Sequence, residues 1–116
     1  MAAADLENTN WTLVSYFDGT AIQQPPADAE VTLAFADGAA GGKSGCNRYQ
    51  SAVTIGDDTL RFGPTMGTKM ACPLPVMEVE QAYLRALEMV ATWRIADSTL
   101  ELQDSGGRTI LTFTHA

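Results

Sequence analysis

The chain has 116 residues, of which 46% are hydrophobic, so it is long and apolar enough for one domain around a single core. Its 14 acidic and seven basic residues give a formal net charge of −7. This balance argues against nucleic acid as a partner and against adsorption to an anionic membrane surface, because both require a basic face.

The sequence also argues against a membrane-spanning segment. Its longest nearly apolar runs are far shorter than the roughly 20 residues that a membrane helix needs. The first residues, MAAADLENTNW, contain neither a basic region nor an apolar stretch of signal-peptide length. We expect no membrane insertion of this domain and a monomeric chain. A cytoplasmic protein and the mature part of an exported protein both stay open.

Alternating apolar residues predict strands in the first third of the chain. The strand at 11–17 ends at an Asp-Gly pair, which is typical of a hairpin turn. Residues 20–30 are expected to form a loop, because two adjacent prolines cannot lie inside a paired strand. A second strand follows at 31–35. The inner faces of the two strands are expected to carry Trp11, Leu13, Ser15 and Phe17, and Val31, Leu33 and Phe35.

Two later segments share one pattern, TIGDDTLRF at 54–62 and RIADSTLEL at 94–102. Each predicts a strand, an acidic turn and a second strand. Two such hairpins fit naturally into one antiparallel sheet or barrel. Further strands are expected over 47–55 and, at the end of the chain, over 108–113.

Residues 75–91 are the one helix-like window. Apolar residues recur there at three- and four-residue steps, as on the buried face of an amphipathic helix. Pro75 suits the first turn, and Glu78 and Glu80 are expected to favour the positive N-terminal end of the helix dipole. The expected buried stripe comprises Val76, Val79, Tyr83, Ala86, Leu87 and Val90, and the opposite face Gln81, Arg85 and Glu88.

The glycine-rich stretch GGKSGCNRY at 41–49 resembles the end of a phosphate-binding loop only at first sight. Such a loop needs a glycine, four residues and Gly-Lys-Ser/Thr, followed by a helix. If Gly42-Lys43-Ser44 ended the motif, its first glycine would be residue 37, which is Asp37. No helical pattern follows. We expect a turn at the entry of a strand, with no ligand and no cofactor.

The remaining residues form no catalytic or metal-binding motif, so we expect no enzyme. His115, the only histidine, is penultimate, where chain ends commonly fray, and any Ser/His/Asp or Cys/His arrangement would have to use it. Two cysteines and one histidine are too few for a structural zinc site. The paired carboxylates at 57–58 and at 78 and 80 have ordinary roles in a turn and at a helix start. A carboxylate-dependent hydrolase is therefore an alternative without support.

The two cysteines, Cys46 and Cys72, both lie in short, turn-rich segments. In an oxidising compartment they would close a loop of roughly 26 residues, worth about 3.5 kcal/mol on the chain-entropy model. As reduced thiols they would be small buried hydrophobic residues. Their spacing alone leaves both states open.

Four blocks, taken in chain order, resemble the META domain family, which includes the heat-shock protein HslJ. They are WTL at 11–13, SGCNRYQ at 44–50, TKMACP at 68–73 and EQAYLRAL at 80–87. The resemblance extends from Trp11 to Phe113. Two positions depart from the family pattern, since Lys69 stands where arginine is usual and Gln50-Ser51 replaces the usual Ser-Gly.

The resemblance implies an α+β fold, with a strongly bent, barrel-like antiparallel sheet and one amphipathic helix at about 75–91 packed across it. It divides the chain into a disordered lead at 1–10 and a single META domain at 11–114. Both cysteines fall on cysteine positions of the family, which favours a disulfide between Cys46 and Cys72. Many members are secreted, periplasmic or lipoprotein-anchored, which favours a location in the periplasm, at the cell envelope or outside the cell.

The family has links to heat stress and virulence but no established enzymatic mechanism or cofactor. The first functional hypothesis is therefore a non-enzymatic, extracytoplasmic domain of stress response or envelope maintenance that binds a protein partner. Its interaction rim would include Asn47, Arg48, Tyr49 and Lys69, although each of these also has an ordinary local role in a turn, an ion pair or packing. The alternative is a module that binds a small apolar ligand in the barrel mouth, lined by Phe35, Phe62 and Trp93.

Overall fold

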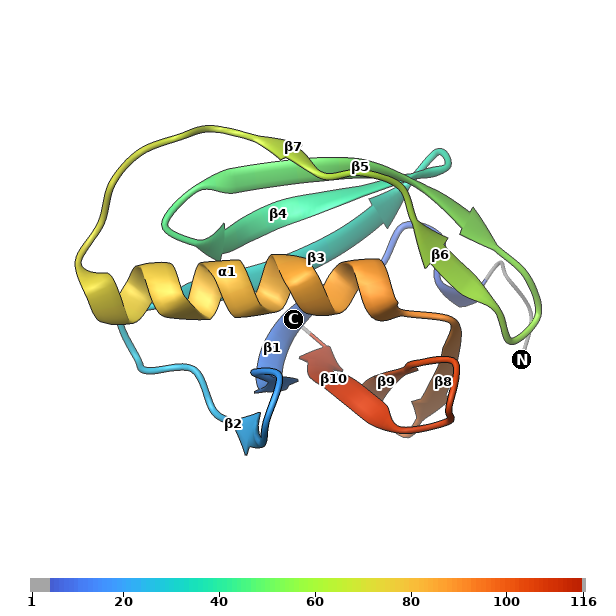
Figure 1. Ribbon diagram of the computed structural model, residues 1–116. Coiled ribbons are helices and arrows are strands. Elements are labelled where there is room, and N and C mark those ends of the chain that lie inside the picture. The colour runs from blue at the N-terminus through green and yellow to red at the C-terminus, as the bar shows by residue number, and fades with distance from the viewer. Residues whose placement is uncertain (1–4, 116) are drawn as a thin grey trace.

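The computed structural model describes residues 5–115 and shows one bent antiparallel sheet with a single helix across its open side (Figure 1). The hydrogen-bonded strand order is β6-β5-β4-β3-β1-β10-β9-β8, with β2 paired to β1 and β7 paired to β5. The predicted α+β class and barrel-like sheet are confirmed. The elements are β1 (Asn10–Phe17), β2 (Ile22–Gln23), β3 (Glu30–Ala36), β4 (Ala39–Gly45), β5 (Arg48–Ile55), β6 (Leu60–Phe62), β7 (Met66–Gly67), α1 (Leu74–Met89), β8 (Thr92–Ala96), β9 (Thr99–Gln103) and β10 (Thr109–His115).

The two hairpins of similar sequence form and meet where the barrel closes. In each of them an isoleucine pairs with a leucine across the turn, Ile55 with Leu60 and Ile95 with Leu100. Strands β6 and β8 then approach each other, and the Leu60 amide donates to the carbonyl of Ala91 at 3.1 Å. Strands β6 and β8 are the first and last strands of the sheet, so their contact nearly closes the sheet into a barrel.

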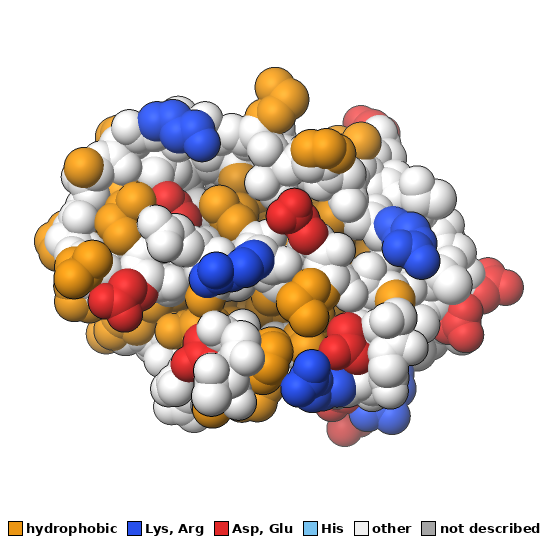
Figure 2. Space-filling view, in the orientation of Figure 1, with side chains coloured by type: hydrophobic (Ala, Val, Ile, Leu, Met, Phe, Trp, Pro, Cys, Tyr) orange, Lys and Arg blue, Asp and Glu red, His pale blue; other side chains and the backbone are white. Residues whose placement is uncertain are grey.

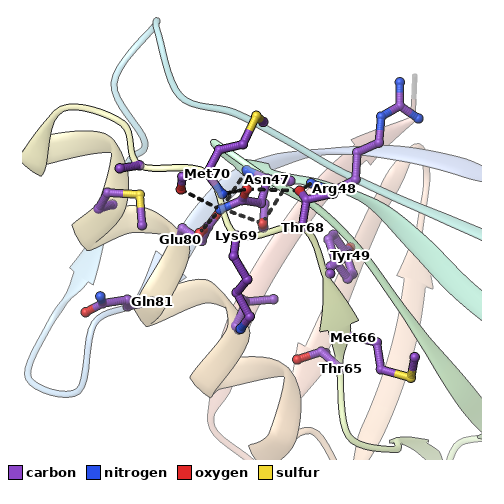
Figure 3. A pocket seen from close by; sticks show the side chains of 15 residues that line it. Asn47, Arg48, Tyr49, Thr65, Met66, Thr68, Lys69, Met70, Glu80 and Gln81 are labelled. Carbon is purple, nitrogen blue, oxygen red and sulfur yellow. Dashed lines mark hydrogen bonds between the residues drawn. The ribbon is translucent and has the colours of Figure 1, made fainter.

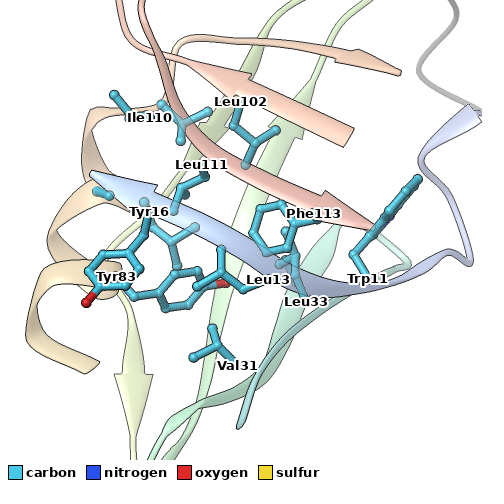
Figure 4. Packing of buried hydrophobic residues seen from close by; sticks show 14 of the residues in the cluster. Trp11, Leu13, Tyr16, Val31, Leu33, Tyr83, Leu102, Ile110, Leu111 and Phe113 are labelled. Carbon is cyan, nitrogen blue, oxygen red and sulfur yellow. The ribbon is translucent and has the colours of Figure 1, made fainter. Parts of the chain in front are cut away.

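The core lies between the concave side of the sheet and α1. Figure 4 shows Leu13, Leu33 and Phe113 directed into this common interior from three neighbouring strands. In β3, Val31, Leu33 and Phe35 are all buried, as alternation predicted. Such period-two burial is what a sheet with one covered face requires.

Strand β1 departs from the simple alternation predicted for it. The register against β10 slips after Leu13, which pairs with Phe113, so that Ser15 pairs with Thr112. A β-bulge of this kind inserts one residue and reverses the faces beyond it. Tyr16 is therefore buried, while Ser15 and Phe17 are only half-buried. The prediction for the inner face of 11–17 holds for its first half and is wrong for its second.

Three further segments differ from expectation. Residues 39–45 form strand β4, where the sequence predicted only a turn at the entry of a strand, because pairing with β3 and β5 on both sides satisfies their backbone groups. His115 belongs to β10, and its amide donates to the carbonyl of Ser98. Its ring centroid lies 4.9 Å from that of Trp11, so His115 is held in the sheet. In the predicted lead, Leu6 is fully buried in the core and the Asn8 amide donates to the carbonyl of Phe35, whereas residues 1–4 lie outside the described part of the chain.

Helix α1 begins at Leu74 and ends at Met89, within two residues of the predicted bounds. Pro73 and Pro75 flank its first residue, where a missing amide donor costs nothing. Every residue of the predicted apolar stripe is buried, and Gln81, Arg85 and Glu88 are exposed. Within residues 5–115 no helix has the length and apolar character to cross a membrane.

Candidate functional site

A groove runs between α1 and the segment that contains β7. We call it the α1–β7 groove; it has a volume of about 370 Å³. One wall is residues 65–71 and the other is the exposed side of α1, while the start of β5 forms the floor (Figure 3). Figure 2 shows this face of the molecule, where hydrophobic, basic and acidic side chains lie next to one another. The groove brings together the four predicted rim residues, Asn47, Arg48, Tyr49 and Lys69.

The floor of the groove is built on Glu80, whose side chain is buried beneath it with 5% of its surface exposed. Its carboxylate accepts four hydrogen bonds from the end of β4 and the β4–β5 turn. The donors are the Ser44 hydroxyl (2.7 Å), the Cys46 amide (3.2 Å), the Asn47 amide (2.7 Å) and the Asn47 side-chain amide (2.7 Å). We call these residues the Glu80 cluster.

The ionisation of Glu80 is set by two opposing effects. Burial raises the pKa of the carboxyl group, and the hydrogen bonds from Asn47, Ser44 and Cys46 lower it. The hydrogen bonds prevail, so the pKa of Glu80 lies below its ordinary value. Glu80 is therefore a carboxylate at neutral pH, with its oxygens already occupied by donors of this chain.

The position of Glu80 corrects its predicted role at the start of the helix. It lies in the second turn of α1 and accepts hydrogen bonds from another element, so it does more than complement the helix dipole. The sequence did contain a signal for this. Residue 80 is four after Val76 and three before Tyr83, which places a charged side chain inside the apolar stripe. A charge at such a position is rarely buried without partners, so partners were to be expected.

Asn47 joins the Glu80 cluster to the opposite wall of the groove. Its side-chain oxygen accepts hydrogen bonds from the Met70 amide at 2.7 Å and from the Thr68 hydroxyl at 2.9 Å. Its side-chain amide donates to the Met70 carbonyl at 3.2 Å in addition to Glu80. One asparagine thus holds the β4–β5 turn, α1 and residues 68–70 together (Figure 3).

A disulfide between Cys46 and Cys72 closes the same corner of the fold, as the family resemblance implied. The two Cα atoms are 6.0 Å apart, within the usual range for a disulfide. The bond ties Cys46, in the β4–β5 turn, to Cys72, which lies two residues before α1. The wall at 65–71 is thereby anchored covalently at its end as well as by Asn47.

Tyr49 packs beneath the groove and faces the helix. Its hydroxyl donates to the Thr32 carbonyl at 2.8 Å and lies 2.5 Å from the hydroxyl of Tyr83, which therefore donates to it. Burial raises the pKa of Tyr49 above its ordinary range, and burial also raises that of Tyr83. Both phenols stay protonated, so Tyr49 supports the floor and is not an exposed rim contact.

Arg48 and Lys69 are the exposed members of the predicted rim. In Figure 3 Lys69 extends along the groove beside α1, whereas Arg48 points away from the Glu80 cluster. Within residues 5–115 neither side chain forms an ion pair. Since the charge of Glu80 is met by buried donors, the accessible charge of the groove is positive on a chain of net charge −7.

The glycines of GGKSGCNRY have backbone roles. Gly45, at φ +118°, begins the turn that presents Cys46 and Asn47 to Glu80, and residues with side chains rarely adopt that conformation. Gly42 lies in β4, where a Cβ atom would contact the Thr32 carbonyl. The stretch is two strand ends and a turn that holds a carboxylate of its own chain. Within residues 5–115 no group of three His, Cys, Asp or Glu side chains is placed to hold a metal ion.

The comparisons with known proteins agree with this fold. The model of the META domain matches residues 4–116. The chain belongs to the META domain family. The match includes the cysteine pair, the Asn-Arg-Tyr run and the helix that carries Glu80. No curated protein matches the chain.

Two solved structures share the fold. An NMR structure of a protein from Burkholderia xenovorans is 30% identical and has a TM-score of 0.80, over 98% of this chain and 86% of that one. A second NMR structure is 17% identical and has a TM-score of 0.73, over 98% of this chain and 94% of that one. At the lower identity the likeness concerns the fold alone.

Proposed function

We propose that this META domain is a non-enzymatic binding module that recognises a protein partner through the α1–β7 groove. The observation that carries the proposal is the construction of the groove. The Glu80 cluster, the Asn47 side chain and the disulfide hold its two walls in one arrangement before any partner arrives. A surface ordered in advance loses less conformational entropy on binding.

The chemistry of the groove favours binding over catalysis. Catalytic acids and bases need a pKa near the working pH, but that of Glu80 is lowered. Ser44 is fully buried and donates to Glu80, so it is not available as a nucleophile. His115 belongs to β10 and packs on Trp11. These features favour neither a carboxylate-dependent hydrolase nor a histidine-assisted enzyme.

The apolar-ligand alternative has no comparable support. Phe35 and Trp93 are buried, and the ring centroid of Phe35 lies 6.3 Å from that of the half-buried Phe62. Phe35 and Trp93 belong to the buried core, and Phe62 packs against it. The ligand mouth expected from these residues is not favoured by their placement.

We further propose an extracytoplasmic location, with a role in stress response or envelope maintenance. The Cys46–Cys72 disulfide supports an oxidising compartment, since cytosolic thiols are normally kept reduced. The role itself follows from the family resemblance. Alkylation and intact-mass measurement of protein taken directly from cells test the compartment, and two free thiols would place the chain in the cytoplasm.

The binding proposal is tested by affinity capture from cell-envelope extracts. Wild-type protein is compared with Lys69→Glu, which reverses the charge inside the groove. Arg61→Glu is the matched control, because Arg61 is also an exposed cation but lies on β6, outside the groove. We expect a partner to be recovered with the wild type and the control and lost with Lys69→Glu. Equal recovery with all three proteins would contradict the proposal.

A further inference from the structure

The wall of the groove at 65–70 is a sheet edge that extends beyond β7, and within residues 5–115 its outer side pairs with no other strand. Gln50 pairs with Met66 and Tyr49 with Gly67. The amide of Thr68 donates to the carbonyl of Arg48 at 3.1 Å, so hydrogen bonding to β5 continues beyond β7. Residues 66 and 68 therefore direct their backbone groups towards β5.

Asn47 extends this pattern by one more step. Its side-chain oxygen accepts a hydrogen bond from the backbone amide of Met70, and its side-chain nitrogen donates one to the carbonyl of Met70. The backbone of a neighbouring strand would make the same two bonds. The backbone groups of residues 66, 68 and 70 thus point towards β5 and Asn47. In an extended chain the alternate residues face the other way, so Gly67 and Lys69 present their backbone amides and carbonyls on the outer side.

The opposite wall offers side chains at a suitable spacing. Met77, Gln81 and Leu84 follow one another on α1 at steps of four and three residues, so they form a stripe beside the buried one. Met77 and Leu84 are half-buried and Gln81 is exposed. An edge strand and a helix stripe therefore flank the groove, and six extended residues of edge would span about 20 Å.

We propose that an extended peptide segment of a partner protein adds as a strand to the outer edge of residues 65–70. The inference rests on the proposed function and specifies its mode. The backbone of the peptide would pair with Gly67 and Lys69, and alternate apolar side chains would contact Met77 and Leu84. Strand addition of this type gains affinity from main-chain hydrogen bonds and specificity from alternate side chains.

The charge of the groove indicates the character of the peptide. Lys69 lies along the groove and Arg48 stands at its rim, both without an ion pair in the described chain. An acidic residue in the peptide would meet Lys69, whereas a basic peptide would be repelled. A second copy of this chain fits less well, since it would bring two cationic edges together.

The test uses display selection of random ten-residue peptides on the immobilised, disulfide-intact protein. We expect enriched peptides that alternate apolar and acidic residues. In the wild-type protein, the amides of Gly67 and Lys69 should become protected from hydrogen exchange when such a peptide binds. Failure to enrich any peptide, or protection elsewhere without protection at Gly67 and Lys69, would overturn strand addition.

Two variants separate the backbone contribution from the charge. Lys69→Ala removes the charge, and Lys69→Pro removes the charge together with an outward amide that makes no bond to β5. We expect the proline variant to bind the selected peptide about tenfold more weakly than the alanine variant, the equivalent of one hydrogen bond. N-methylation of alternate peptide amides should have a similar effect while leaving the protein unchanged. Equal affinities in both comparisons would overturn the proposal.

The same variants keep this inference distinct from the proposed function. If the captured envelope partner is lost with Lys69→Glu but binds Lys69→Pro and Lys69→Ala equally, the groove binds a folded surface and only strand addition is wrong. If capture is insensitive to all three, the proposed function itself fails. A concentration-dependent dimer that is abolished by Lys69→Pro would assign the edge to a second copy and overturn the peptide proposal.

Discussion

The two sides of the barrel are held together by different forces. On the side of β1, β9 and β10, fully buried apolar side chains meet without directional contacts, and they include Leu100, Leu102, Ile110, Leu111 and Phe113. On the side of α1, β5 and β7, a buried carboxylate, an asparagine and a disulfide join three elements. Apolar packing tolerates small shifts, whereas hydrogen bonds fix distance and angle. The polar side is the one that defines the groove.

The largest effect is expected from truncation in the apolar half. Phe113→Ala removes a fully buried ring and should lower the free energy of unfolding by about 3–5 kcal/mol. Thr114→Ala, at the adjacent exposed position, should change it by less than about 0.5 kcal/mol. Chemical denaturation measures both. Amide NMR shifts at residues 44–47 should stay close to wild type in the folded fraction, and large shifts there would show that the two halves are not separable.

The disulfide is the next largest contribution and belongs to the polar half. Replacing both Cys46 and Cys72 with alanine releases a closed loop with a sequence separation of 26. The expected loss is about 3.5 kcal/mol on the chain-entropy model. Hydrogen exchange should accelerate at residues 68–71 more than in β9 and β10. Uniform acceleration across the sheet would contradict the assignment of the disulfide to the groove wall.

Substitution of Glu80 tests the hydrogen-bond network directly. Glu80→Gln keeps the shape but places an amide group against donors, so it should cost about 2–3 kcal/mol. The matched control is Glu78→Gln, an exposed carboxylate on the same helix that should change stability little. Denaturant unfolding measures both variants. Equal stabilities would mean that the four hydrogen bonds to Glu80 contribute nothing net.

The smallest and most specific expected effect is the pH dependence of the stability that Glu80 contributes. Since the pKa of folded Glu80 is below its unfolded value of 4.5, its contribution is fully present above pH 4.5 and is lost as the pH falls through the folded pKa. The stability difference between wild type and Glu80→Gln should therefore narrow in that acidic range. Unfolding curves at a series of pH values measure it. A difference that stays constant with pH would show that Glu80 is not ionised in the folded chain.

The apolar core could be predicted almost entirely from the sequence. Alternation identified β3 and β10, the acidic turns identified both hairpins, and three- and four-residue spacing identified the buried stripe of α1. These patterns are local, because a side chain faces the core according to its position in a strand or helix. The family resemblance added the disulfide and the four residues that gather at the groove.

Only the tertiary structure decided the rest. The bulge in β1 depends on its register with β10, and β4 became a strand because both neighbours pair with it. The network between Glu80 and Asn47 joins residues 33 positions apart, and no short stretch of sequence encodes such a pairing. The outward edge at Gly67 and Lys69 arises in the same way, from inward bonds made by their neighbours. Side-chain burial has a period along the chain, whereas hydrogen-bond partners depend on where distant segments meet.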